Sequence, residues 1–147
     1  LLMMFIGFAE GYKRHQNRLL IKEGLMVGFF LAGLVVLGGL QKWWLQDLLG
    51  GLEPFVLFWG ATALTAITDN AALTYLGSLV EGTNDVWRYM LVAGAVTGGG
   101  LTVIANAPNP AGFSILKNHF PDGSISPGRL FVCALAPTAV AAVMFLI

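Results

Sequence analysis

The sequence has 147 residues, of which 56% are hydrophobic and 11% are charged, and its mean hydropathy is +0.75. This composition leaves too little polar surface to solvate a globule of that size, so the sequence predicts an integral membrane protein. The formal net charge is zero and the basic residues do not gather into an extended groove, which excludes the electrostatic footprint of a nucleic-acid-binding protein.

The chain opens on an apolar stretch, residues 1–9, without an initiator Met. Nine apolar residues are about half of what a bilayer crossing needs. We therefore expect residues 1–147 to form a single membrane domain that is the C-terminal fragment of a larger transporter.

Residues 10–23 are the most polar stretch and carry half of all Lys and Arg, which predicts a cytoplasmic loop by the positive-inside rule. Residues 24–40 are uncharged and apolar, about the lower limit of length for a spanning helix. This predicted span ends at Lys42-Trp43-Trp44, residue types that favour the membrane interface. Residues 45–52 are then expected to lie along the outer interface as a short amphipathic helix.

The next segment, residues 53–80, begins with Glu53-Pro54, which is typical of a helix N-terminus. Its apolar run is interrupted at Thr68-Asp69-Asn70, and each half is too short to span a bilayer. Either one continuous helix with a polar middle or a re-entrant hairpin fits this pattern. We favour the hairpin, because it returns the chain to the outside and lets the next crossing bring Lys117 and Arg129 to the cytoplasm.

Residues 86–117 predict a broken span, because glycines 98–100 and the Asn- and Pro-rich stretch 106–112 cannot continue a helix. Residues 129–147 predict a last span. The expected fold class is an all-α integral membrane protein, whose transmembrane helices include one re-entrant helical hairpin and one broken helix.

Irregular backbone persists at membrane depth only where protein or a water-filled cavity satisfies its polar groups, so two breaks in a short chain suggest a site. We expect the two breaks to face each other. Asp69 is the one carboxylate deep in an apolar segment, where its insertion costs about 2.5 to 3.5 kcal/mol, and this predicts a functional group. A proton and Na⁺ would compete for it. Alternatively Asp69 caps a helix that begins at Asn70, and both roles are compatible.

Hard oxygen ligands are the type that small cations prefer. The expected side-chain ligands besides Asp69 are Thr68, Asn70, Asn106 and Asn109, and the expected backbone carbonyls are those of Gly99, Ala105 and Ala107. Threonine hydroxyls in membrane helices often bond back to their own helix. We expect that structural use for Thr62, Thr65, Thr97 and Thr102. No cofactor is expected. No metal beyond the transported cation is expected either, since His15 and His119 lie in predicted loops and no Cys or carboxylate is spaced with them as a metal site requires.

Two motifs together resemble the ion transporter superfamily: AITDNAALTYL at residues 66–76 and GGGLTVIANAPNPAG at residues 98–112. That superfamily includes arsenite pumps, sodium/proton antiporters and dicarboxylate carriers, and within it bacterial Na⁺/H⁺ antiporters are the most similar. The resemblance implies two inverted repeats, each with a hairpin and a broken helix, of which this chain is similar to the second. It also implies ion-binding roles for two sets of residues, namely Thr68, Asp69 and Asn70 at the tip and Gly99, Asn106 and Asn109 at the break.

The dicarboxylate branch typically carries Ser-Asn-Thr where this chain has Thr68-Asp69-Asn70, and an acidic tip favours cations. The predicted function is therefore cation/proton antiport, of the Na⁺/H⁺ type, by alternating access in a bacterial inner membrane, and not enzymatic catalysis. The expected partners are the lipid bilayer, the missing repeat or a partner chain, and further copies or subunits of a complex. The alternatives are an accessory membrane subunit and a transporter of anions.

Overall fold

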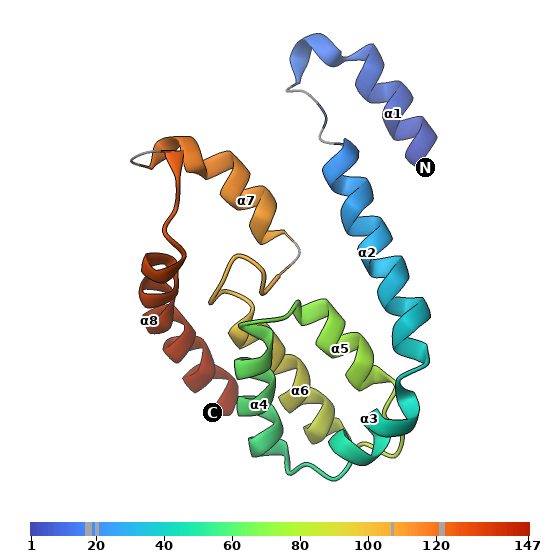
Figure 1. Cartoon of the computed structure of the whole chain (residues 1–147), viewed down its shortest axis with the longest axis vertical. Helices are drawn as coiled ribbons and strands as arrows, with labels where there is room; N and C mark the ends of the chain where they lie inside the picture. Colours follow the sequence, from blue (N-terminus) through green and yellow to red (C-terminus); the bar gives the residue numbers. More distant parts are fainter. Residues whose placement is uncertain (17–18, 20, 107, 121–122) are drawn as a thin grey trace. The chain divides into compact units, whose positions relative to one another are not determined.

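Every regular element in the described part of the chain is a helix, as the sequence predicts (Figure 1). The computed structural model describes residues 1–16, 19, 21–106, 108–120 and 123–147. The chain falls into two units, Leu1–Phe30 and Leu31–Ile147, and the helix α2 (Ile21–Gly39) begins in the first and ends in the second.

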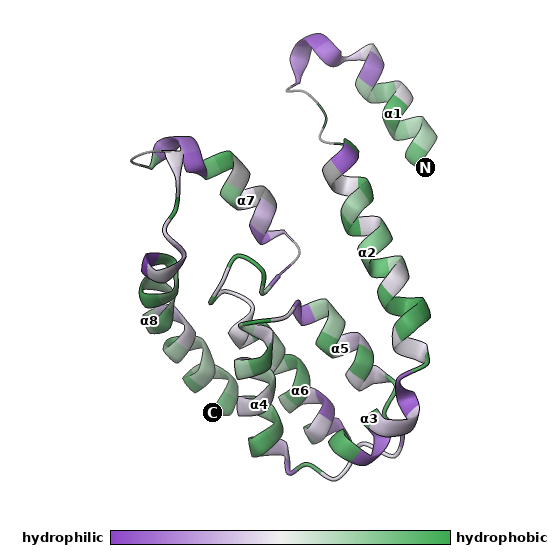
Figure 2. Cartoon of the chain, viewed as in Figure 1, coloured by the Kyte–Doolittle hydropathy of each residue, from purple (hydrophilic) through white to green (hydrophobic). Residues whose placement is uncertain are grey.

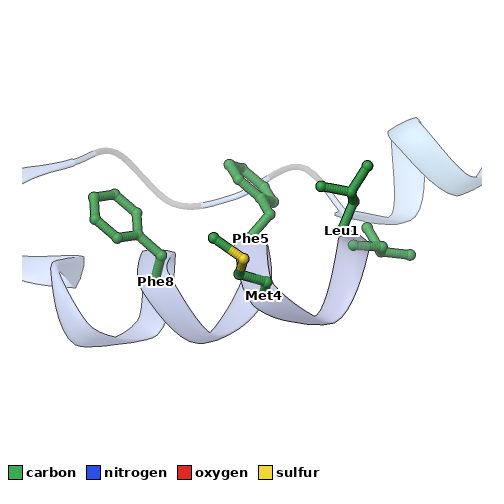
Figure 3. A pocket seen from close by; sticks show the side chains of 5 residues that line it. Leu1, Met4, Phe5 and Phe8 are labelled. Atoms are coloured by element: carbon green, nitrogen blue, oxygen red, sulfur yellow. The ribbon is translucent and has the colours of Figure 1, made fainter.

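The first unit contains α1 (Leu2–Gly11), the short 3-10 helix η1 (Lys13–His15) and the start of α2. Most apolar side chains of α1 are exposed, and five apolar residues line an open pocket along the helix (Figure 3). The residues of this pocket are Leu1, Leu2, Met4, Phe5 and Phe8. The polar end of the helix carries an exposed ion pair between Glu10 and Lys13.

The second unit holds the remaining elements: α3 (Lys42–Leu49), α4 (Pro54–Thr65), α5 (Asn70–Ser78), α6 (Asp85–Gly98), α7 (Asn109–Leu116), η2 (Lys117–His119) and α8 (Pro127–Leu146). The segment predicted at 53–80 is thus two helices, α4 and α5, and the segment predicted at 86–117 is α6, α7 and η2. The predicted span at 24–40 begins earlier, at Ile21, and ends at Gly39. The helix predicted at 45–52 is α3, which starts and ends three residues sooner, at Lys42 and Leu49.

Local sequence explains where three of these helices begin. Glu53 caps α4 by accepting a hydrogen bond from the Val56 amide, and Pro54 occupies the first turn, where no donor is needed. Asn84 caps α6 by accepting from the Trp87 amide at 2.8 Å. Asp69 caps α5 in the same way, which confirms the structural role predicted for it.

The chain turns back between α4 and α5. Leu57, near the start of α4, and Val80, just after α5, belong to one buried cluster with Trp87 and Leu91 of α6. A continuous helix would separate Leu57 from Val80 by about 35 Å at 1.5 Å per residue. The two helices therefore form a hairpin whose tip is residues 66–69 (Figure 1). Its re-entrant placement in a bilayer stays a prediction.

Helices α4 and α6 make the most extensive contact between elements, and glycine allows it. A Cβ added at Gly94 would lie 2.3 Å from the Phe58 carbonyl oxygen, and one added at Gly98 would lie 2.3 Å from the Thr62 carbonyl oxygen. Such small residues let two backbones approach closely, which is how helices associate where lipid removes the hydrophobic driving force. Each helix of the pair ends directly before one of the two breaks, α4 at Thr65 and α6 at Gly98.

Helix α3 joins the other end of the hairpin. The Gln46 amide nitrogen donates to the Glu81 carbonyl at 3.0 Å, and the Gln46 amide oxygen accepts from the Glu81 amide at 2.8 Å. The Lys42 ammonium pairs with the Glu81 carboxylate, and the Trp87 indole donates to the Leu49 carbonyl at 3.3 Å. These contacts hold the end of the hairpin opposite the tip, where residues 79–84 form the loop from α5 to α6. We refer to it as the loop end.

Among the described residues, α8 is long and apolar enough to cross a membrane. A second candidate arises if Gly24–Gly39 and Lys42–Leu49 are one span, although the two helices are bent by 79°. Hydrophobic residues run along α2 and α8, and hydrophilic residues lie near the start of each helix (Figure 2). Only 6% of the apolar window of α8 is buried, so this helix is not the core helix of a globule.

Candidate ion-binding site

The two breaks in the helices meet. The hairpin tip contributes residues 66–69 together with the first residue of α5, and the segment between α6 and α7 contributes residues 99–106 and 108. Two hydrogen bonds join them: the Asn70 amide donates to the Ala105 carbonyl at 3.0 Å, and the Thr102 hydroxyl donates to the Ala66 carbonyl at 2.7 Å. The expectation that the breaks face each other therefore agrees with the structure.

The positions of these two bonds have a simple geometric meaning. In a continuous α-helix the Asn70 amide would donate to the Ala66 carbonyl, four residues back. The break at the tip separates this donor from this acceptor, and both then find partners on the turn formed by residues 102–105. That turn is closed by a hydrogen bond of 3.4 Å from the Ala105 amide to the Thr102 carbonyl. It replaces one lost helical bond with two bonds between segments.

Asp69 lies between the two residues that are held in this way. One carboxylate oxygen accepts hydrogen bonds from the Ala71 amide at 2.9 Å and the Ala72 amide at 3.2 Å. The side chain is half-buried. In the part of the chain that the structure describes, the ion pairs are Lys13–Glu10 and Lys42–Glu81, and Asp69 takes part in neither. The amides at the start of α5 thus stabilise a carboxylate that keeps its charge.

Asn70 and Gly99 are also brought together. A Cβ added at Gly99 would lie 3.0 Å from the Asn70 side-chain nitrogen, so the Asn70 amide group packs directly on the Gly99 backbone. The absence of a side chain at Gly99 therefore makes room for Asn70. Both are residues that the sequence assigns to the ion site.

Asn109 joins the two sides of the break between α6 and α7. Its side-chain nitrogen donates to the Gly99 carbonyl at 3.0 Å and to the Thr102 carbonyl at 2.9 Å. Because both partners are acceptors, the nitrogen must face them, which leaves the amide oxygen directed elsewhere. The first residue of α7 thus ties the end of α6 to the 102–105 turn, a role that the sequence did not predict.

Most of the other expected ligand residues already take part in hydrogen bonds. Thr68 is exposed, and its hydroxyl donates to the Leu64 carbonyl at 2.8 Å, within its own helical turn. Asn106 is half-buried, and its carbonyl accepts from the Asn109 amide at 3.0 Å. The carbonyls of Gly99 and Ala105 each already accept one hydrogen bond. The expected carbonyl of Ala107 lies outside the described residues.

The threonine hydroxyls divide into two groups. Thr62, Thr65 and Thr97 each donate to the carbonyl four residues earlier, at 2.9, 2.8 and 2.7 Å, as the sequence predicts. Thr102 was expected to do the same, and that expectation is wrong. The chain is not helical at Thr102, so its hydroxyl crosses to Ala66 instead.

The described residues hold no group of three or more His, Cys, Asp or Glu side chains that could bind a metal ion. A cation near Asp69 would therefore rest on one carboxylate and on neutral oxygens, the ligand type that hard cations accept.

Comparison with known families adds one finding. A family profile described as "Putative Na+/H+ antiporter" matches residues 1–147. The chain belongs to this family. Membership confirms the resemblance found in the sequence, places the chain among transporters of cations and protons, and implies a membrane protein. No curated protein and no solved structure matches the chain.

Proposed function

We propose that the chain forms one half of a Na⁺/H⁺ exchange site, with the Asp69 carboxylate as the group at which Na⁺ and H⁺ compete. The observation that supports this best is the 102–105 turn. It is hydrogen-bonded to Ala66, which precedes Asp69 in the chain, and to Asn70, which follows it. A functional carboxylate must be held in place by its surroundings, and a carboxylate that only caps a helix has no need of such support.

The site would combine one negative charge with neutral oxygens. The Asp69 carboxylate keeps an oxygen that accepts neither of the two cap bonds, and the Asn109 amide oxygen lies opposite a nitrogen held by two carbonyls. We expect Asn70, Thr68 and Asn106 to add ligands only after local rearrangement. Competition for one carboxylate predicts that the half-saturating Na⁺ concentration rises as pH falls.

The proposed setting is a bacterial inner membrane. There the α4–α5 hairpin would be re-entrant, the α6–α7 segment would be a broken span, and α2 and α8 would cross the bilayer. Alternating access would require a second, inverted repeat, in the same polypeptide or in a partner chain. We expect the complete transporter to work as a homo-oligomer or within a larger complex, with no cofactor.

The test is Na⁺-driven proton flux in vesicles that contain the full-length transporter, with Asp69→Asn compared with the native residue. Asparagine is as good an N-cap as aspartate, so this substitution keeps the cap of α5 and removes only the charge. We expect flux to fall to the level of empty vesicles.

Asp85→Asn is the matched control, because Asp85 also lies in the first turn of a helix and is exposed. It should keep most of the native flux. Asp69→Ala should lose the flux and in addition lose about 1 kcal/mol of stability through the missing cap. If Asp69→Asn retains native flux while Asp69→Ala is only less stable, the carboxylate is a cap, and the alternative of a structural or accessory membrane subunit is favoured.

A transporter of anions, of the arsenite or dicarboxylate type, is the other alternative. A charged carboxylate at the tip repels a substrate anion, so this function would need Asp69 to be neutral during binding. Arsenite or dicarboxylate uptake that persists in Asp69→Asn vesicles, without any Na⁺-driven proton flux in native ones, would favour it.

A further inference from the structure

We propose that Thr102 is a positioning residue of the ion site, whose hydroxyl holds the hairpin tip, and with it the Asp69 carboxylate, against the 102–105 turn. The inference rests on the proposed exchange role of Asp69. It assigns a role to a residue whose hydroxyl the sequence predicted to bond within its own helix.

The hairpin tip is bonded to the 102–105 turn on both sides of Asp69. Ala66 is held through its carbonyl by Thr102, and Asn70 is held through its amide by Ala105, at 2.7 and 3.0 Å. Between them lie Ile67, Thr68 and Asp69. With both ends fixed, the backbone of Asp69 has little freedom, and its carboxylate is placed with respect to the break.

The backbone of Thr102 is also bonded to the rest of the segment between α6 and α7. The Thr102 carbonyl accepts hydrogen bonds from the Asn109 side chain at 2.9 Å and from the Ala105 amide at 3.4 Å. Thr102 therefore contacts the hairpin tip through its side chain and the start of α7 through its backbone. Removing the hydroxyl breaks one of the two hydrogen bonds that hold the tip, leaves the Asn70–Ala105 bond to hold it alone, and keeps the bonds within the break.

Thr102 differs from Thr97 in that its hydroxyl bonds to another segment of the chain. A hydroxyl that bonds to its own helix, such as that of Thr97, can be lost without moving any element relative to another. The Thr102 hydroxyl satisfies a carbonyl that the break has deprived of its helical donor, and a polar group left unpaired in an apolar setting is costly. The tip must then find another partner or shift.

The experiment uses the full-length transporter in vesicles and compares three variants. Thr102→Val keeps the side-chain shape and removes the hydroxyl, Thr102→Ser keeps the hydroxyl, and Thr97→Val is the matched control. We expect Thr102→Val to raise the half-saturating Na⁺ concentration about three- to tenfold, the equivalent of one hydrogen bond, with a smaller change in maximal rate. Thr102→Ser and Thr97→Val should stay within about twofold of the native value.

A second measurement does not depend on transport. Hydrogen exchange of the peptide that contains the Asn70 amide, in the detergent-solubilised protein, reports whether the tip is still bound to Ala105. We expect faster exchange in Thr102→Val, native exchange in Thr102→Ser, and no change in Thr97→Val. A variant that simply misfolds would exchange faster along the whole chain.

The outcomes separate the two proposals. Absence of Na⁺-driven flux in the native protein overturns the exchange function, and the Asn70 exchange rate then decides alone whether Thr102 holds the tip. A native Asn70 exchange rate in Thr102→Val overturns the positioning role. So does faster Asn70 exchange with an unchanged half-saturating Na⁺ concentration, because the hydroxyl would then serve stability only.

Discussion

The two ends of the α4–α5 hairpin are held by different chemistry. The tip is joined to the rest of the chain by neutral hydrogen bonds from Thr102 and Asn70 and by tight packing below it at Gly98. The loop end is joined to α3 through Gln46 and through the ion pair of Lys42 with Glu81, all at exposed positions. Charges are therefore used where water can solvate them, and the one carboxylate at the predicted membrane-depth end forms no ion pair with the described residues.

This difference predicts unequal sensitivity. The tip end should respond strongly to changes in volume and weakly to salt, because its contacts are buried or partly buried and are uncharged. The loop end should respond weakly to single substitutions and more to pH and salt, because exposed charges are screened.

The largest effect is expected for Gly98→Ala. The added Cβ would lie 2.1 Å from the Thr65 hydroxyl oxygen and 2.3 Å from the Thr62 carbonyl oxygen, and a backbone atom cannot rotate away. Helix α4 must shift, at a loss of about 1 to 3 kcal/mol. The measurement is the thermal unfolding midpoint in detergent.

Gly60→Ala is the control for that prediction, because a Cβ at Gly60 of α4 meets no atom within 4 Å. It should gain about 0.5 to 1 kcal/mol from better helix propensity. Equal midpoints for Gly98→Ala and the native protein would show that α4 and α6 are not packed this closely.

A smaller effect is expected for Gln46→Ala at the loop end. The substitution removes both hydrogen bonds to the Glu81 backbone, whose groups can turn to water instead, so the loss should be about 1 kcal/mol or less. Asp47→Ala, an exposed neighbour on α3, is the control and should leave the unfolding midpoint unchanged. A loss as large as that of Gly98→Ala would mean that the two ends are equally buried.

The smallest effect concerns the ion pair. The hydrogen bond and charge of Lys42 lower the pKa of Glu81 below its ordinary 4.5. A carboxylate with a lowered pKa stabilises the fold above its unfolded pKa, and this contribution is lost as pH falls through the folded value. Glu81→Gln should therefore unfold at a slightly lower temperature at about pH 6, and the difference from the native protein should shrink as the pH is lowered below the unfolded pKa. High salt should reduce the difference at the higher pH, and a difference that grows on acidification would contradict this account.

Sequence predicted the breaks and the starts of α4 and α5, because those depend on local chemistry. Glu53-Pro54, Asp69 and the glycines at 98–100 act on their own neighbours, so their effect can be inferred without knowing the fold. The roles of Thr102 and Asn109 could not be inferred, because a hydroxyl or an amide can donate to any carbonyl within reach. The carbonyl that Thr102 binds lies 36 residues earlier in the chain. The one available signal is that Ala66 loses its helical donor at the break.

The exchange of one helical bond for two bonds between segments also affects how the protein is made. Ala66 and Asn70 are synthesised well before Thr102 and Ala105, so the polar groups of the tip have no protein partner while the chain emerges from the ribosome. An unpaired backbone group is not tolerated in lipid. In a re-entrant hairpin, as proposed above, the tip must therefore stay hydrated, or shielded by the insertion machinery, until residue 105 has emerged, and the hairpin settles only together with the segment that follows it.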